Sequence, residues 1–366
     1  MGLLSLLKQS NVIYIIFGIT FLTSGLIINF FQCFLYFGLR PFSRYLYRKI
    51  NYYLCYSLYS QFVFVAEWWA GLELRNLKKI INMYEIDWIC GWILCERTGV
   101  LGNCKAYVKK SLQYVPTFGW AWRFAEFIFM ERNWEKDKKI ITSLINELVN
   151  YPDSITLLLC AEGTRVTAQK LEASQKFAQK AGLPILNYHL TPRTKGFIAS
   201  LPHMRGKITD IYDIQLQFKS DDPIKPTLTN LLQGKQVTAY LSISRIPLDE
   251  VPEDEKGAEE WLHKLYEKKD RMAKSFEETG DFFAISEVPK LERSIIKKRY
   301  YSLVNIICWT VVVLTPMLYY LINLLLSGSI IYFLIGASIY LLMQRMIGMS
   351  KISKSSSYGT NDKKLQ

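Results

Sequence analysis

Glu162 and Arg165 lie at the end of an apolar run and have side chains suited to binding a phosphate. They belong to the stretch LLLCAEGTR, residues 157–165. A short apolar run that ends at a glycine predicts a buried strand whose carboxyl end delivers both side chains to a surface. Gly163 lets the backbone approach a ligand closely, and a guanidinium offers a forked pair of donors to phosphate. A strand followed by a charged turn is common, so this stretch alone does not identify a function.

Two further stretches change the interpretation. EIDWICGW, residues 85–92, contains Asp87, and LTPRTKGF, residues 190–197, contains Arg193 and Lys195. In this order and at these separations, the three stretches resemble the 1-acylglycerol-3-phosphate O-acyltransferases, which are also called lysophosphatidic acid acyltransferases. The resemblance extends from about Trp68 to Gly280 and is closest to the longer eukaryotic branch, which has a C-terminal hydrophobic pair.

The resemblance implies that the chain transfers an acyl group from acyl-CoA to lysophosphatidic acid or a related lysophospholipid, as a step of phospholipid synthesis. Such a reaction needs a base near the acceptor hydroxyl, a group that holds the base, and an anchor for the phosphate. By resemblance Asp87 holds the base and Glu162 orders the anchoring turn. The anchor itself then consists of Arg132, Gly163, Thr164 and Arg165.

The resemblance also bears on the second substrate. Arg193 and Lys195 either meet the phosphates of coenzyme A or face solvent. We expect no cofactor beyond acyl-CoA as co-substrate. We also expect no metal ion, because no cluster of metal ligands with suitable spacing occurs in the sequence.

One part of the family pattern is missing. The family has a histidine five residues before the aspartate, where it removes the proton from the acceptor hydroxyl. In this chain Asn82 occupies that position relative to Asp87, and an amide has no useful proton affinity near neutral pH. The same spacing is not rebuilt at any of the chain's three histidines, His189, His203 and His263.

Three explanations for the missing histidine remain: an alternative transcript, a faulty gene model, or a real loss of catalysis. We favour the first two, because the other motifs are intact. We therefore expect an acyltransferase whose activity is impaired in this chain. The alternative is a catalytically inactive membrane protein that binds lysolipid or a partner protein without turnover.

Composition agrees with a membrane enzyme that handles phosphorylated lipids. The chain has 366 residues, half of them hydrophobic, and a formal net charge of +13. Such a charge suits anionic headgroups or phosphorylated substrates. Nucleic acid is not expected as a partner, because the sequence has no zinc spacing or RNA-binding signature. The seven cysteines have no paired metal spacing, and those at 33, 160 and 308 predict buried, reduced thiols of a cytosolic domain.

Hydrophobic segments at both ends predict membrane anchoring. No charged residue occurs from Gln9 to Leu39, which is enough for one tilted helix or for a pair that dips in and returns. A second charge-free stretch, Tyr300 to Gln344, is long enough for a hairpin of two spans. Basic residues after the first segment and around the second place the catalytic domain in the cytosol. The ending KKLQ resembles a dilysine signal for the endoplasmic reticulum.

Between these segments, alternating strands and helices predict a layered α/β acyltransferase-like domain. Strands are expected near 106–108, at 157–160, at 185–190 and in two half-exposed runs around 214–218 and 237–243; helices are expected at 119–129, 135–150, after Thr167, and at 253–280. His189 is expected to be a packed structural histidine. The predicted domains are 1–67 (membrane anchor and interfacial stretch), 68–292 (catalytic domain), 293–347 (transmembrane hairpin) and 348–366 (disordered cytosolic tail).

Overall fold

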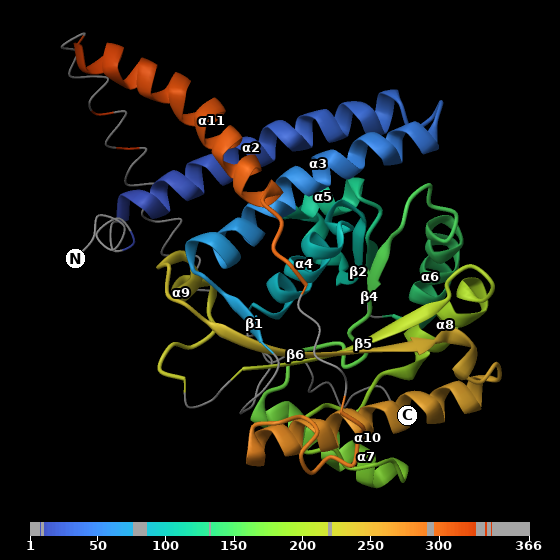
Figure 1. Ribbon diagram of the computed structural model, residues 1–366. Helices are drawn as coiled ribbons and strands as arrows, with labels where there is room; N and C mark the ends of the chain where they lie inside the picture. The colour runs from blue at the N-terminus through green and yellow to red at the C-terminus, as the bar shows by residue number, and fades with distance from the viewer. Residues whose placement is uncertain are drawn as a thin grey trace. The chain divides into compact units, whose positions relative to one another are not determined.

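The computed structural model describes residues 8, 11–75, 86–131, 133–218, 222–290, 296–326, 334 and 338. The chain divides into two compact units. One consists of Met1–Thr20 with Ile307–Gln366, and the other is Phe21–Ile306. The larger unit contains all the described strands and is mixed α/β (Figure 1).

Helix α2 (Asn11–Gly38) contributes its residues from Phe21 onward to the larger unit, where it lies beside α3 (Arg44–Phe64) (Figure 1). Polar side chains join the two helices. Gln61 Nε2 donates to Ser24 Oγ at 2.9 Å, and Gln32 Nε2 donates to Asn51 Oδ1 at 2.9 Å. Because all four side chains are buried or partly buried, these bonds fix the two helices against each other.

The first sheet is parallel and has the order β3-β2-β4. Parallel neighbours need crossover connections, and helices supply them here. The elements follow one another as β2 (Cys104–Lys109), α5 (Phe118–Phe124), β3 (Ile128–Met130), α6 (Trp134–Leu148) and β4 (Thr156–Leu158). Helix α6 packs Ile141, Ile145 and Leu148 against Ile128 of β3.

The second sheet has the order β1-β6-β5, with β1 (Glu73–Arg75) parallel to β6 (Thr238–Pro247) and β5 (Asp210–Phe218) antiparallel to it. Helix α10 (Glu255–Thr279) covers one face of this sheet (Figure 1). There Met272 and Phe276 pack against Tyr240 of β6.

The remaining elements are short connections and the helices that carry the motifs. They are a π-helical turn (Val65–Trp69), α4 (Asp87–Thr98), 3-10 turns (Leu101–Asn103, Lys110–Tyr114 and Leu248–Glu250), α7 (Ala168–Ala181), α8 (Thr194–Met204), α9 (Leu228–Leu232) and α11 (Tyr301–Leu326).

Several sequence predictions are confirmed. Helices α6 and α10 and strands β2, β5 and β6 lie where the sequence pattern places them. Thr167 caps α7 by accepting a hydrogen bond from the backbone N of Lys170, and the helix ends at Gly182 with a left-handed backbone. The helix predicted over 119–129 is shorter, because Glu126 takes a left-handed backbone (φ 62°) and β3 begins at Ile128.

The strand predicted over 185–190 is wrong. The segment is irregular, because side chains take the backbone donors that a strand would offer to a neighbour. Asp270 accepts from the backbone N–H groups of residues 187–189, and Glu162 accepts from the backbone N–H of Leu190. The structural role expected for His189 is confirmed, since its buried ring lies 3.3 Å from both Asp270 Oδ1 and Gln215 Nε2.

The prediction of a buried strand over 157–160 also needs correction. Strand β4 ends at Leu158, and that side chain is 37% exposed. The reason is that β4 is an edge strand of its sheet.

The prediction that Cys33, Cys160 and Cys308 are buried, reduced thiols is wrong in part. All seven thiols are free, but Cys33, Cys160 and Cys308 are exposed.

Two described helices are long and apolar enough to cross a bilayer by length and composition, over Ile13–Gly38 and Tyr301–Tyr320. The second span of the predicted C-terminal hairpin and the predicted tail, including the lysine-containing end, fall largely outside the described residues. The predicted domain boundaries remain predictions.

Candidate active site

The turn after β4 is held in a conformation that suits glycine. Gly163 has φ +67°, and its backbone N–H donates to the Cys160 carbonyl at 3.0 Å. A residue with a Cβ is strained in this left-handed region. Thr164 follows, and its Oγ1 accepts a hydrogen bond from Lys170 Nζ at 2.7 Å. The turn therefore brings its backbone and the amine of Lys170 close together.

Arg193 lies against this turn. Its backbone N–H donates to the Ala161 carbonyl at 2.8 Å. A Cβ added to Gly163 would stand 3.2 Å from Arg193 Cδ and 3.3 Å from its Nε. The third sequence stretch is thus packed directly on the first, and the glycine leaves room for the guanidinium to approach.

Two exposed guanidinium groups, one on the turn and one packed against it, are available to a ligand. Arg165 and Arg193 are both exposed, and within the described part of the chain neither forms an ion pair with a carboxylate. Two such groups beside a glycine backbone can donate several hydrogen bonds to one phosphate.

Glu162 is directed inward. It is 7% exposed, and its Oε2 accepts a hydrogen bond from the Leu190 backbone N–H at 3.1 Å. Burial raises the pKa of this carboxyl, while the nearby His189 and the bond from Leu190 act in the opposite direction. In the structure Glu162 therefore ties the turn to the segment before α8.

Asp87 is the first residue of α4, where the helix dipole favours a negative charge. It lies within electrostatic range of the turn. Removal from water and then the negative charges of Glu162 and Asp87 raise the pKa of the Cys160 thiol, although part of the Cys160 side chain is exposed. The charge of Asp87 therefore acts on the thiol that lies two positions before Glu162.

Asn82 and Arg132 lie outside the described residues, so their predicted roles stay predictions. The residues beside Arg132 are described. Asn133 caps α6 by accepting from the backbone N of Lys136, and Lys195 Nζ stands 5.6 Å from the centre of the Trp134 ring. Lys195 is thus near the start of α6.

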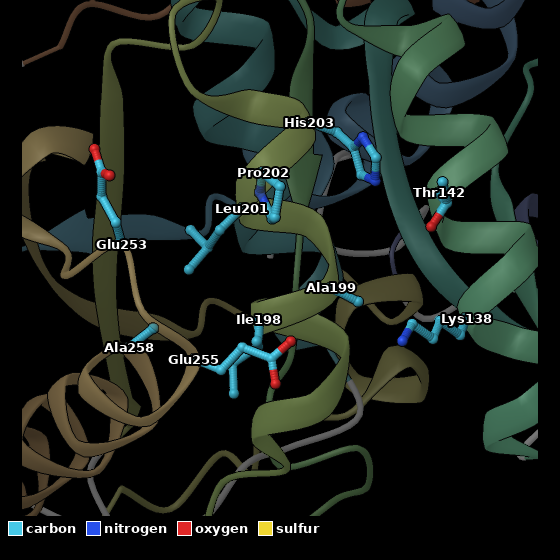
Figure 2. Close-up of a pocket in the computed structure, with 10 residues that line it drawn as sticks. All are labelled: Lys138, Thr142, Ile198, Ala199, Leu201, Pro202, His203, Glu253, Glu255 and Ala258. Carbon is cyan, nitrogen blue, oxygen red and sulfur yellow. The ribbon is translucent and has the colours of Figure 1, made fainter.

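A cavity of about 140 Å³ lies elsewhere, between α6, α8 and the start of α10 (Figure 2). None of the predicted site residues lines it, but His203 does (Figure 2).

His263 is mostly buried, with its Nε2 3.9 Å from Glu259 Oε1, and burial lowers its pKa. Across the described ranges, no group of three or more His, Cys, Asp or Glu side chains could hold a metal ion. The absence of a metal remains a prediction.

Sequence reasoning missed two residues of this region. Lys170 was detectable, because it lies six residues after Thr164 and within the first turn of the helix that follows. Asp270 carried no local signal, since it contacts residues 187–189 across more than 80 positions of sequence.

Comparison with known proteins agrees with the motifs. Residues 82–209 match the acyltransferase family, and residues 230–309 match the acyltransferase C-terminus family. The 1-acyl-sn-glycerol-3-phosphate acyltransferase gamma of Mus musculus is 39% identical over 385 residues, which cover 100% of this chain and 99% of that protein. The gamma protein of Homo sapiens is 39% identical over 383 residues, covering 99% of each chain.

The delta protein of Homo sapiens is 38% identical over 387 residues, covering 100% of this chain and 99% of that protein. No solved structure matches the chain. The resemblance inferred from the three motifs is thereby confirmed, and this chain belongs to the 1-acyl-sn-glycerol-3-phosphate acyltransferase family.

Proposed function

We propose that the activity encoded by this family member is transfer of an acyl group from acyl-CoA to lysophosphatidic acid or a related lysophospholipid, and that this chain performs it poorly or not at all. The names of the relatives support the substrate class. The single observation that carries the proposal is the packing of Arg193 on Gly163, beside exposed Arg165, within electrostatic range of Asp87.

The proposed reaction is an acyl transfer. The free hydroxyl of the lysolipid attacks the thioester carbonyl, so that a C–O bond forms and the C–S bond to coenzyme A breaks. The hydroxyl proton must go to a base, and the thiolate of coenzyme A leaves and takes up a proton. Arg165 and Arg193 bind the lysolipid phosphate and so hold the hydroxyl in place. Asp87 would orient a base at position 82.

The base is the missing part. Asn82 cannot accept the proton, and the loss of general-base catalysis typically lowers the rate by a factor of about 100 to 10,000.

The alignment with a relative supports the explanation that this chain lacks a segment. The alignment with the mouse gamma protein spans 385 positions, although the chain has only 366 residues. The relative therefore has residues that this chain lacks.

The sequence makes both Arg193 and Lys195 candidates for contact with the phosphates of coenzyme A, and we assign them different roles. Arg193 is held on the phosphate-binding turn, so we assign it to the lysolipid. Lys195 is exposed beside Trp134, and we keep it as the candidate contact to the phosphates of coenzyme A.

We place the enzyme at the membrane of the endoplasmic reticulum, with its catalytic domain in the cytosol. The larger unit exposes many apolar and aromatic side chains on α2 and α3, which suit lipid contact. They include Leu26, Phe30, Phe31, Phe34, Phe37, Tyr45 and Tyr53. Two apolar helices and the net charge of +13 agree with membrane association.

The test is an acyl-CoA assay in microsomes that compares the chain as written with Asn82→His and with Asn82→Gln as a matched control. We expect Asn82→His to raise turnover of lysophosphatidic acid by about 100-fold or more and Asn82→Gln to leave it unchanged. If neither the histidine variant nor a chain that carries the missing segment with its histidine were more active than the chain as written, the proposed reaction would be refuted. Ordinary turnover by the chain as written would refute its impairment.

The second candidate is a membrane pseudoenzyme that binds lysolipid or a partner protein without turnover, and the missing histidine is the observation that favours it. Sequencing the transcript across the codons for residues 72–82 separates the two. A transcript that includes a longer segment with the histidine supports the enzyme. A unique transcript that encodes the chain as written supports the pseudoenzyme.

A further inference from the structure

Asp270 of α10 accepts hydrogen bonds from three consecutive backbone N–H groups. Its Oδ2 accepts from Asn187 at 2.9 Å, and its Oδ1 accepts from Tyr188 at 2.7 Å and His189 at 3.0 Å. Asp270 is 8% exposed. Hydrogen bonds to a charged acceptor are stronger than those between neutral groups, and they strengthen where water is excluded. One carboxylate therefore fixes the path of the chain before α8.

The next donors along this segment lead directly to the phosphate-binding turn. The backbone N–H of Leu190 donates to Glu162 Oε2 at 3.1 Å, and that of Thr191 donates to Ser174 Oγ of α7 at 2.8 Å. The backbone N–H of Arg193 then donates to the Ala161 carbonyl. In the segment 187–193, the backbone N–H of almost every residue thus donates a hydrogen bond to a partner outside the segment.

Helix α10 is itself fixed to the second sheet next to Asp270. Lys269 Nζ donates to Asp213 Oδ1 at 2.6 Å and to the Ile214 carbonyl at 2.8 Å, both on β5. His189 adds a contact from the loop, with its Nδ1 3.3 Å from Asp270 Oδ1 and its Nε2 3.3 Å from Gln215 Nε2 on β5. The loop that precedes Arg193 is therefore held at a defined position on β5 and α10.

We propose that Asp270 is a positioning residue for the lysolipid phosphate: by binding the backbone of residues 187–189 it sets the segment that holds Glu162 and places Arg193 on Gly163. This inference rests on the proposed function, because it assigns Asp270 to the same phosphate site. It gives helix α10, which lies outside the three motifs, an indirect part in substrate binding.

The test uses the purified full-length chain in detergent micelles that contain lysophosphatidic acid or, for comparison, monoacylglycerol, which lacks the phosphate. Asp270→Asn keeps the shape of the side chain but removes its charge. We expect it to weaken binding of lysophosphatidic acid about tenfold, with little change for monoacylglycerol. We also expect the amides of residues 187–190 to exchange with solvent about tenfold faster.

Ser275→Ala is the matched control on the same helix. Ser275 Oγ donates to the Asp281 carbonyl at 2.6 Å and accepts from the Ile285 N–H at 3.1 Å, so its loss weakens the fold without touching the segment before α8. We expect it to lower the melting temperature but to leave the affinity for lysophosphatidic acid within about twofold. Asp270→Glu keeps the charge and serves where Asp270→Asn does not fold. It should show the same pattern with a smaller effect.

Equal losses of affinity in Asp270→Asn and Ser275→Ala would overturn the proposal, because they would indicate a general effect on stability. Unchanged affinity and unchanged exchange in the Asp270 variants would also overturn it. A wild-type chain that binds lysophosphatidic acid no better than monoacylglycerol would instead refute the proposed function. In that case the exchange rates of residues 187–190 still decide whether Asp270 holds the segment.

Discussion

Single residues decide whether the turn after β4 can bind a phosphate. Gly163 gives the turn its left-handed backbone and leaves the space that Arg193 fills. Arg165 and Arg193 supply charge, while Glu162 faces inward and holds the turn to Leu190. The functional residues of the motif therefore divide into those that a ligand would touch and those that keep the turn in place.

The role of Gly163 can be separated from simple backbone strain. Gly163→Ala forces a Cβ into the left-handed region and toward Arg193, whereas Gly182 has the same backbone conformation (φ +66°) with nothing within 4 Å of its would-be Cβ. We expect each alanine to lower the free energy of unfolding by about 1 kcal/mol. Only Gly163→Ala should weaken binding of lysophosphatidic acid, because only the Cβ added at Gly163 would displace a guanidinium, that of Arg193.

Melting curves and equilibrium binding of lysophosphatidic acid check this pair. A Gly163→Ala variant that binds the lysolipid as well as Gly182→Ala does would show that Arg193 is not part of the phosphate site.

At the scale of secondary structure, the basic residues after α2 turn toward the α/β domain. Arg40 and Arg48 pair with Glu126 at 3.4 and 2.8 Å, and Arg44 pairs with Glu147 at 3.3 Å. The sequence predicts this cluster only as a signal for membrane orientation. The pairs with Glu126 tie the start of α3 and the residues before it to the segment between α5 and β3, where Glu126 has a left-handed backbone. The pair with Glu147 ties α3 to α6.

The pair Arg48–Glu126 is buried, with each side chain 7% exposed. Arg48→Met would leave the carboxylate without its closest partner, so we expect the free energy of unfolding to fall by about 3 to 5 kcal/mol. Lys176→Met removes the exposed pair with Glu172 on α7 and should cost about 0.5 kcal/mol or less. Thermal unfolding of both variants in detergent measures the difference. Equal melting temperatures would contradict a structural role for the buried pair.

Local sequence signals account for the elements that were predicted correctly. Helix α7 has a threonine cap and a terminal glycine, and α6 has one apolar face, so neighbouring residues suffice to define them. The strand predicted at 185–190 is wrong because its donors are taken by Asp270, which is distant in sequence. The exposure of β4 depends on its place at the sheet edge, which no pattern within the strand records.

At the scale of the whole chain, the three motifs were sufficient to identify the family, because their order and separations are specific. The contacts of the segment before α11 could not be anticipated in this way. There Lys298 Nζ donates to the Glu67 carbonyl at 3.1 Å, and Arg299 Nη1 donates to the Glu96 carbonyl at 2.9 Å near the end of α4. A cation is favourable at a helix C-terminus, so this basic run also stabilises the helix that begins with Asp87.

The central claim is that the turn from Glu162 to Arg165 binds a lipid phosphate, and selective binding tests it most directly. The measurement is the affinity of the full-length chain for lysophosphatidic acid and for monoacylglycerol, which lacks the phosphate, in detergent micelles, with Arg165→Ala and the exposed control Arg271→Ala on α10. We predict that the chain binds lysophosphatidic acid at least about tenfold more tightly and that only Arg165→Ala abolishes this preference. Equal affinity of the unaltered chain for the two lipids, or an equal loss in both variants, would contradict the claim.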